Sequence, residues 1–239
     1  MKKNGMLIPA NPAISSYYHK WIEEIETAGL PLNITYTSTY VLFDKKLNYI
    51  QYDQALSDYY KKIFLELSKE SKITLIAHSA GSYFALRLLE QFPEKIEKVI
   101  IMFPYIGYSK YSLLNFVYIP YVIDRFFPLV EFISKYKNIL FRYEKQIRNI
   151  SSEQLKANLR FGVRQCTYFI DKKFPVETIA CLKDKINFIY TEGDKWCPPK
   201  AIELLKDVSG QCRKVELPHD FILNESDRLK MIEVLKTLD

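Results

Sequence analysis

Residues 71–91, SKITLIAHSAGSYFALRLLEQ, restrict the folds open to this chain more than any other stretch. The apolar, β-branched residues 73–77 predict a short buried strand. The apolar residues after it recur at the spacing of a packed helix: Tyr83, Phe84, Leu86, Leu88 and Leu89. A strand that turns into a helix through small residues holds its central side chain in a strained, exposed position. The stretch therefore predicts a strand–turn–helix unit with Ser79 at the turn.

The turn itself, AHSAG at residues 77–81, matches the nucleophile pattern G-x-S-x-G except that Ala77 replaces the first glycine. The extra methyl group leaves less room where strand and helix backbones come close. Serine also commonly caps helices, so a simple connection between the two elements is the alternative. The flanking strand and helix are the context that the pattern requires, and they favour Ser79 as a nucleophile.

Strands and helices alternate along most of the 239 residues. Strands are predicted at residues 6–9, 33–42, 73–77, 96–103, 186–190 and 214–217, and the helices between and after them include residues 18–25, 56–67, 201–208 and 226–238. This alternation predicts a single α/β domain, residues 1–239, with a mostly parallel sheet flanked by helices. Residues 105–180 break the alternation, and we expect them to form an inserted helical lid over the active site.

Composition excludes several classes of protein. The formal net charge is +6, but Lys and Arg are scattered among Asp and Glu, so nucleic-acid binding is not predicted. Weak attraction to an anionic membrane surface is compatible with this charge. The four cysteines form no C-x-x-C pair and have no histidine cluster beside them, so we expect free thiols in a reducing, cytoplasmic compartment and neither a metal nor another cofactor. The first apolar run is too short for a signal peptide, which predicts that the protein is not secreted.

An uncharged aromatic stretch, YSLLNFVYIPYVI at residues 111–123, lies inside the predicted lid. It is shorter than a membrane-spanning helix, and Pro120 interrupts it, so it is not expected to span a bilayer. Two interpretations remain open: packing of a buried lid, or a surface that dips into lipid.

A serine nucleophile needs a histidine as base and a carboxylate to orient that histidine. The chain has only three histidines. His78 adjoins Ser79 in the turn, where its side chain should point away from the hydroxyl, and His19 is expected at the surface of the first helix. His219 follows the last predicted strand, at the carboxyl edge where sites of α/β sheets collect, and it is therefore the predicted base. The alternative is a loop histidine without a role.

The acid should lie between nucleophile and base, just after a strand. Asp194 meets this condition because Gly193 allows a sharp turn after the strand at residues 186–190. Glu192 is the next candidate, and three further carboxylates rank behind it: Asp171, Asp184 and Asp207. The alternative is an aspartate in a solvated turn.

Acyl transfer also requires two backbone N–H groups that point at the developing oxyanion. One is expected from Ala80, the residue after the nucleophile. The other is expected from Asn11 in the loop after the first strand, since Pro12 has no N–H to donate.

Five segments resemble the lipid droplet-associated serine hydrolases, a branch of the α/β-hydrolases. These are LIPANPAISSYY, YIQYDQALSDYYKKIFLEL, AHSAGSYFALRLL, GDKWCP and LPHDFIL, which extend over nearly the whole chain apart from about residues 108–180. The resemblance implies Ser79 as nucleophile, Asp194 as acid and His219 as base. Ala10, Ala13 and Ala77 stand where the family has glycines.

The family resemblance implies hydrolysis of neutral lipid esters, such as sterol or glycerol esters, by a cytoplasmic protein at the surface of lipid droplets or the endoplasmic reticulum. Such an enzyme should lose activity at acidic pH, because a protonated imidazole no longer accepts the serine proton. The alternative is a lipid-droplet or membrane-surface binding protein with a hydrolase fold and little catalysis. Acyl transfer to an alcohol would use the same residues, and the sequence fixes neither the acyl length nor the oligomeric state.

Overall fold

The computed structural model describes residues 2–10, 15–37, 49–105, 176–194, 196–197, 199–208 and 211–238. The lid predicted at residues 105–180 lies outside the described residues except at its two ends, and it stays a prediction. The aromatic stretch at residues 111–123 lies wholly outside them. None of the helices in the described ranges is long and apolar enough to span a bilayer.

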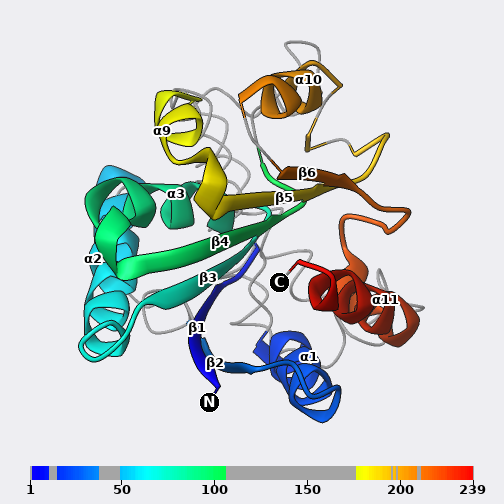
Figure 1. The fold of residues 1–239 in the computed structure, drawn as a ribbon, viewed down its shortest axis with the longest axis horizontal. Helices are drawn as coiled ribbons and strands as arrows, with labels where there is room; N and C mark the ends of the chain where they lie inside the picture. The colour runs from blue at the N-terminus through cyan, green and yellow to red at the C-terminus, as the bar shows by residue number, and fades with distance from the viewer. Residues whose placement is uncertain are drawn as a thin grey trace, which may run out of the picture.

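A six-stranded sheet forms the centre of the molecule (Figure 1). Its strands are β1 (Lys3–Ile8), β2 (Leu32–Tyr36), β3 (Ile73–His78), β4 (Ile96–Met102), β5 (Ile186–Tyr190) and β6 (Gln211–Lys214). They lie in the order β2-β1-β3-β4-β5-β6, and every neighbouring pair is parallel. The predicted mostly parallel sheet is confirmed, and β3 lies near its centre with all six residues buried.

Helices cover both faces of the sheet (Figure 1). One face packs against α2 (Tyr49–Leu67), α3 (Gly81–Gln91), α9 (Val176–Cys181) and α10 (Pro199–Val208), and the other against α1 (Ser15–Thr27), α11 (Glu225–Lys236) and the 3-10 turn η5 (Phe221–Leu223). Along β3, Leu75 and Ala77 face the α2–α3 side and Ile76 faces the α1–α11 side. Burial on both faces explains why the central strands are apolar at successive positions and do not alternate with polar residues.

The last strand differs from its prediction. It was expected at residues 214–217, whereas β6 spans Gln211–Lys214 and pairs with β5 from Asn187 to Tyr190. The alternating apolar residues Val215 and Leu217 that suggested the strand are buried just beyond its end. The prediction was wrong because β6 is a half-exposed edge strand, whose position is decided by the backbone of β5 and not by an apolar period of its own.

Candidate active site

Ser79 occupies a backbone conformation that few non-glycine residues adopt. Its φ angle is +51°, directly after β3 and before α3, which confirms the predicted strain. Its N–H donates to the Met102 carbonyl at 3.0 Å, and its own carbonyl accepts from the Ser82 N–H at 3.0 Å and from the Ser82 hydroxyl. The side chain was expected to be exposed, but Ser79 is only 6% exposed, because the turn is buried and the His219 ring lies against its hydroxyl.

Gly81 is the glycine of the turn that sterics require. A Cβ at this position would lie 2.4 Å from the Ile8 carbonyl oxygen and 2.9 Å from that of Pro9, both of them backbone atoms. Helix α3 therefore begins in direct contact with the end of β1. Ala77 occupies the position of the other glycine in the pattern, and its methyl group is fully buried in the core under α2 and α3.

The three residues predicted from the sequence meet at the carboxyl edge of the sheet. Nδ1 of His219 lies 2.8 Å from Oδ2 of Asp194, and Nε2 lies 2.9 Å from Oγ of Ser79. An ionised carboxylate only accepts hydrogen bonds, so Nδ1 carries the proton and donates it to Asp194. Nε2 is then free to accept from the Ser79 hydroxyl, which is the arrangement that removes a proton from an attacking serine.

Asp194 is held by the turn around it. Gly193 has a φ of +80°, and the Trp196 N–H donates to Oδ1 of Asp194 at 2.8 Å, which leaves Oδ2 for His219. The runner-up acid, Glu192, points elsewhere: its exposed carboxylate pairs with Lys214 at 2.7 Å. The hydrogen bond from Lys214 also holds the pKa of Glu192 below its ordinary value.

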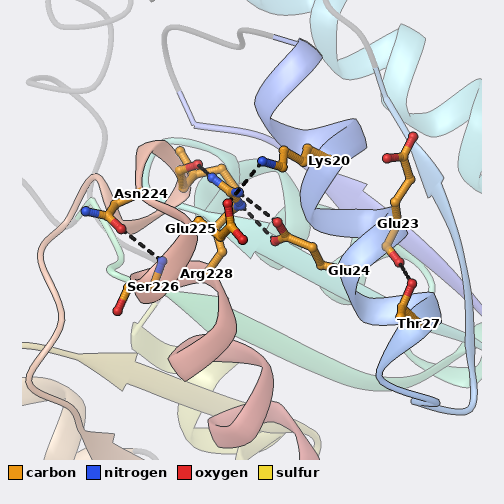
Figure 2. A network of polar contacts seen from close by, with 9 residues as sticks. Lys20, Glu23, Glu24, Thr27, Asn224, Glu225, Ser226 and Arg228 are labelled. Atoms are coloured by element: carbon orange, nitrogen blue, oxygen red, sulfur yellow. Dashed lines mark hydrogen bonds and ion pairs between the residues drawn. The ribbon is translucent and has the colours of Figure 1, made fainter.

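Arg228 of α11 connects the segment that follows His219 to α1; Figure 2 shows its ion pair with Glu24. Arg228 of α11 donates through Nε and Nη2 to the Glu24 carboxylate of α1 at 2.8 and 2.7 Å, and through Nη1 to the Ile222 carbonyl at 3.2 Å. The Arg228 side chain is 3% exposed, and its hydrogen bonds to Glu24 raise its pKa. At the start of α11, the Asn224 side chain accepts from the Ser226 N–H at 2.9 Å and caps the helix.

The other two histidines lie where the sequence predicted. His78 is 2% exposed and points away from the Ser79 hydroxyl: Nδ1 lies 2.8 Å from the Tyr18 hydroxyl and Nε2 lies 2.9 Å from the His219 carbonyl oxygen. Burial lowers the pKa of His78 to about 3, so the ring is neutral. His19 is exposed on α1, with its ring edge-on to Tyr36.

The predicted oxyanion donors are partly described. Ala80 stands at the N-cap of α3, where the first backbone N–H groups of a helix have no partner within the helix. Asn11 lies outside the described residues. The residue before it, Ala10, donates its N–H to the Tyr18 hydroxyl at 2.8 Å.

Aromatic rings surround His219. Phe103 and Trp196 have ring centroids 5.9 and 6.2 Å from it, and Tyr105 lies 5.9 Å from Trp196. A cavity of about 520 Å³ adjoins His219, Asp194 and Trp196. Sequence reasoning missed Tyr18, Phe103 and Trp196 as neighbours of the site, although the position of Trp196 two residues after Asp194 is the spacing of an Asx turn.

Within the described ranges, no group of three or more His, Cys, Asp or Glu side chains is placed to hold a metal ion. Cys181, Cys197 and Cys212 are free thiols there, and Cys166 lies outside the description. Burial, with the nearby Asp194 charge, raises the pKa of Cys197 to about 12. This thiol is therefore not a thiolate nucleophile at neutral pH.

Residues 2–227 match a protein family described as lipid-droplet associated hydrolase. The chain belongs to this family. Among its curated relatives, the lipid droplet-associated hydrolase of Homo sapiens is 29% identical over 90% of this chain and 78% of its own length. That of Dictyostelium discoideum is 23% identical over 95% of this chain and 84% of its own length. The family resemblance drawn from the sequence is thus confirmed.

Two solved structures of similar shape are esterases with low sequence identity to this chain. A carboxylesterase structure from Nitrososphaera gargenis has a TM-score of 0.67 at 13% identity and covers 98% of this chain and 89% of its own. A thermophilic esterase from Thermogutta terrifontis has a TM-score of 0.63 at 12% identity, with 99% and 89% covered. These similarities confirm the predicted α/β-hydrolase fold, and family and fold together make the chain a hydrolase.

Proposed function

We propose that this member of the lipid-droplet associated hydrolase family is a serine esterase that uses Ser79, His219 and Asp194 as a catalytic triad. The observation that carries the proposal is the continuous hydrogen-bonded chain from Asp194 Oδ2 through both nitrogens of His219 to Ser79 Oγ, with distances of 2.8 and 2.9 Å. The strained φ of Ser79 adds support, because that conformation turns the hydroxyl toward a base from another segment.

In the acylation step, Ser79 Oγ attacks the ester carbonyl carbon while Nε2 of His219 takes the hydroxyl proton. The Asp194 carboxylate stabilises the imidazolium that forms, through the hydrogen bond to Nδ1. Collapse of the tetrahedral intermediate expels the alcohol, which receives the proton from Nε2. Water then attacks the acyl-enzyme with the same assistance from His219, releases the carboxylic acid and restores Ser79.

The oxyanion of the intermediate would be bound by the N–H groups of Ala80 and Asn11. Ala80 is supported by its place directly after Ser79 at the start of α3. Asn11 is supported within residues 9–12, directly after β1: Pro9 and Pro12 have no N–H, and the N–H of Ala10 is given to Tyr18. The loss of one such donor lowers kcat by roughly 10²-fold to 10³-fold in serine hydrolases.

The substrate class we propose is a carboxylic ester of a lipid, such as a sterol or glycerol ester, met at the surface of a lipid droplet or membrane. This is supported by the names of the relatives, which are lipid droplet-associated hydrolases, and by the esterases among the similar structures. Binding at that surface would be peripheral.

The test is covalent labelling of the purified protein with a fluorophosphonate, an electrophile that reacts rapidly with activated serines. We expect labelling of the wild type and of His19→Gln, a control for the surface histidine, and none of Ser79→Ala or His219→Gln. A panel of esters with increasing acyl length would then rank the substrates, with and without artificial lipid droplets.

Equal labelling of the wild type and Ser79→Ala would contradict the proposal. If the folded wild type stays unlabelled even with lipid droplets present, the protein is better explained as a lipid-surface binding protein with little catalysis. Flotation of the protein with the droplets would measure that binding directly.

A further inference from the structure

A second chain of hydrogen bonds lies beneath the proposed triad and uses a histidine that the mechanism does not need. It begins at the Ala10 N–H, passes through the Tyr18 hydroxyl and the His78 ring, and ends at the His219 carbonyl oxygen, with three contacts of 2.8, 2.8 and 2.9 Å. Tyr18 and His78 are 1% and 2% exposed. Water therefore does not compete for these contacts.

Chemistry fixes the direction of every proton in this chain. The His219 carbonyl oxygen only accepts, so Nε2 of His78 must be the donor. A neutral imidazole with a proton on Nε2 has an acceptor at Nδ1, so the Tyr18 hydroxyl donates to His78. The hydroxyl oxygen of Tyr18 then accepts from the Ala10 N–H. Each group can therefore act in only one direction as donor or acceptor. If the proton were on Nδ1 of His78 instead, the Tyr18 hydroxyl could not donate its hydrogen to that nitrogen.

The chain connects three segments that are far apart in the sequence and that must keep a fixed relation during the proposed reaction. Ala10 is in the loop after β1, immediately before the proposed oxyanion donor Asn11. His78 is the last residue of β3, immediately before Ser79. His219 is in the loop after β6. The surrounding rings keep the two aromatic members in place: Tyr18 is stacked on Tyr36 at 5.5 Å between ring centroids, and the His78 ring lies 5.1 Å from that of Phe221 and 6.1 Å from that of Phe103.

We propose that Tyr18 and His78 are positioning residues, which hold the backbone of Ala10, just after β1, and the backbone of His219 in register with Ser79 through this neutral, directional hydrogen-bond chain. The inference rests on the proposed function, because the groups that the hydrogen bonds would align are the proposed nucleophile, base and oxyanion site. Neither side chain touches the substrate. Their effect is on geometry, and displacement of a reacting group by about 1 Å lowers rates by as much as roughly 10²-fold.

The central variant is Tyr18→Phe, which removes one hydroxyl group and keeps the ring that stacks on Tyr36. We expect the rate constant for fluorophosphonate labelling, and kcat for an ester, to fall by about tenfold while KM stays nearly constant. The matched control is Tyr60→Phe, the same change at a buried tyrosine on the opposite face of the sheet, in the core with Phe84. Its rates should equal those of the wild type.

A nitrogen-15 NMR measurement tests the hydrogen-bond directions without any activity. The three histidines can be assigned with single substitutions. We expect His78 to be the neutral tautomer with its proton on Nε2 between pH 5 and pH 8, and its Nδ1 signal to move in Tyr18→Phe, when the hydroxyl donor is lost.

Four outcomes are informative. A proton on Nδ1 of His78, or a charged His78 ring at pH 6, would disprove the proposed hydrogen-bond chain, whatever the activity of the variants. If folded Tyr18→Phe has the same rates as the wild type, the hydrogen-bond chain has only a structural role, even if the melting temperature is lower. The proposed function is then unaffected. A wild type that labels no faster than Ser79→Ala removes the proposed function and this inference together. A tenfold loss confined to Tyr18→Phe, with the expected tautomer, supports it.

Discussion

The turn that carries Ser79 and the loop that carries His219 are held in place in different ways. Ser79 sits between a fully buried strand and a helix whose first residue, Gly81, touches the backbone of β1. The His219 loop follows a half-exposed edge strand and is tied to the rest of the protein by side chains from other elements: Asp194, His78 and Arg228. Close packing fixes the first region, and hydrogen bonds to side chains of other elements fix the second.

His78 and His219, which lie next to each other, differ in the same way as the two regions to which they belong. The rings of His78 and His219 are 5.5 Å apart between centroids. His78 belongs to the buried strand and has both nitrogens bound to neutral groups, while the His219 side chain is 20% exposed and lies between a carboxylate and a hydroxyl. The same imidazole is a fixed connector in one region and the proposed proton carrier in the other.

The largest expected effect is on catalysis, through the hydrogen bond that joins the His219 loop to Asp194. Asp194→Asn keeps the shape of the side chain but no longer forces the proton onto Nδ1 of His219, so kcat should fall by about 10⁴-fold. The matched control is Glu192→Gln, two residues away, whose carboxylate pairs with Lys214 at the surface and whose loss should leave kcat unchanged. Steady-state hydrolysis of a short ester measures both. A larger loss of kcat in Glu192→Gln than in Asp194→Asn would mean that Glu192, and not Asp194, is the acid.

Close packing in the turn should make Gly81→Ala the most destabilising small change in that region. The added Cβ would meet two backbone carbonyls that cannot rotate away, and we expect a loss of about 3 kcal/mol in the free energy of unfolding. Gly193→Ala, in the turn before Asp194, is the comparison: nothing lies within 4 Å of a Cβ built there, and only the positive φ opposes the change, at about 1 kcal/mol. Urea unfolding compares the two variants, and equal losses would show that the carbonyls of Ile8 and Pro9 do not make the Ser79 turn less tolerant.

Removal of the anchor of the His219 loop should have an intermediate effect. Arg228→Met leaves the partly buried Glu24 carboxylate and the Ile222 carbonyl without their donor, and we expect a loss of about 2 kcal/mol in the free energy of unfolding. Lys236→Met is the control, since Lys236 pairs with Glu233 at the surface of the same helix, where ion pairs contribute little. Urea unfolding of both variants is the measurement. Equal stability of the two would mean that the loop is held without this anchor.

The smallest effect concerns His78 and pH. Folding lowers its pKa from 6.5 to about 3, so below pH 6.5 the unfolded chain binds a proton that the folded chain does not. Stability from this group is therefore complete above pH 6.5 and is lost as the pH falls toward 3. Between pH 7.5 and 5.5 the wild type should lose about 1.4 kcal/mol more than His78→Gln, which has no group that titrates there. Urea unfolding at both pH values gives the difference, and parallel pH dependences would mean that His78 titrates normally.

The turn around Ser79 could be predicted from the sequence because the residues that define it are adjacent in the chain. Residues 73–91 contain the strand, the small residues of the turn and the helix in one stretch, and the structure has these elements close to the predicted bounds. The choice of Asp194 over Glu192 was also local, since it depended on one glycine and on the end of β5. The edge strand β6 was misplaced by three residues because its register is set by β5, which is separated from it by a helix and its connections.

The residues alone were enough to predict the alternation of strands and helices, the turn around Ser79, and Asp194 and His219 as the other members of the candidate site. Each depends on side-chain size, apolar period or backbone freedom within a few residues of the position concerned. The folded structure was needed to show that Tyr18 contacts Ala10 and His78, that Arg228 anchors the loop of His219, and which neighbour each nitrogen of His78 contacts. The two contacts of His78 join residues 60 and 141 positions apart, and hydrogen bonds over such separations leave no periodic trace, because the folded sheet alone brings their partners together.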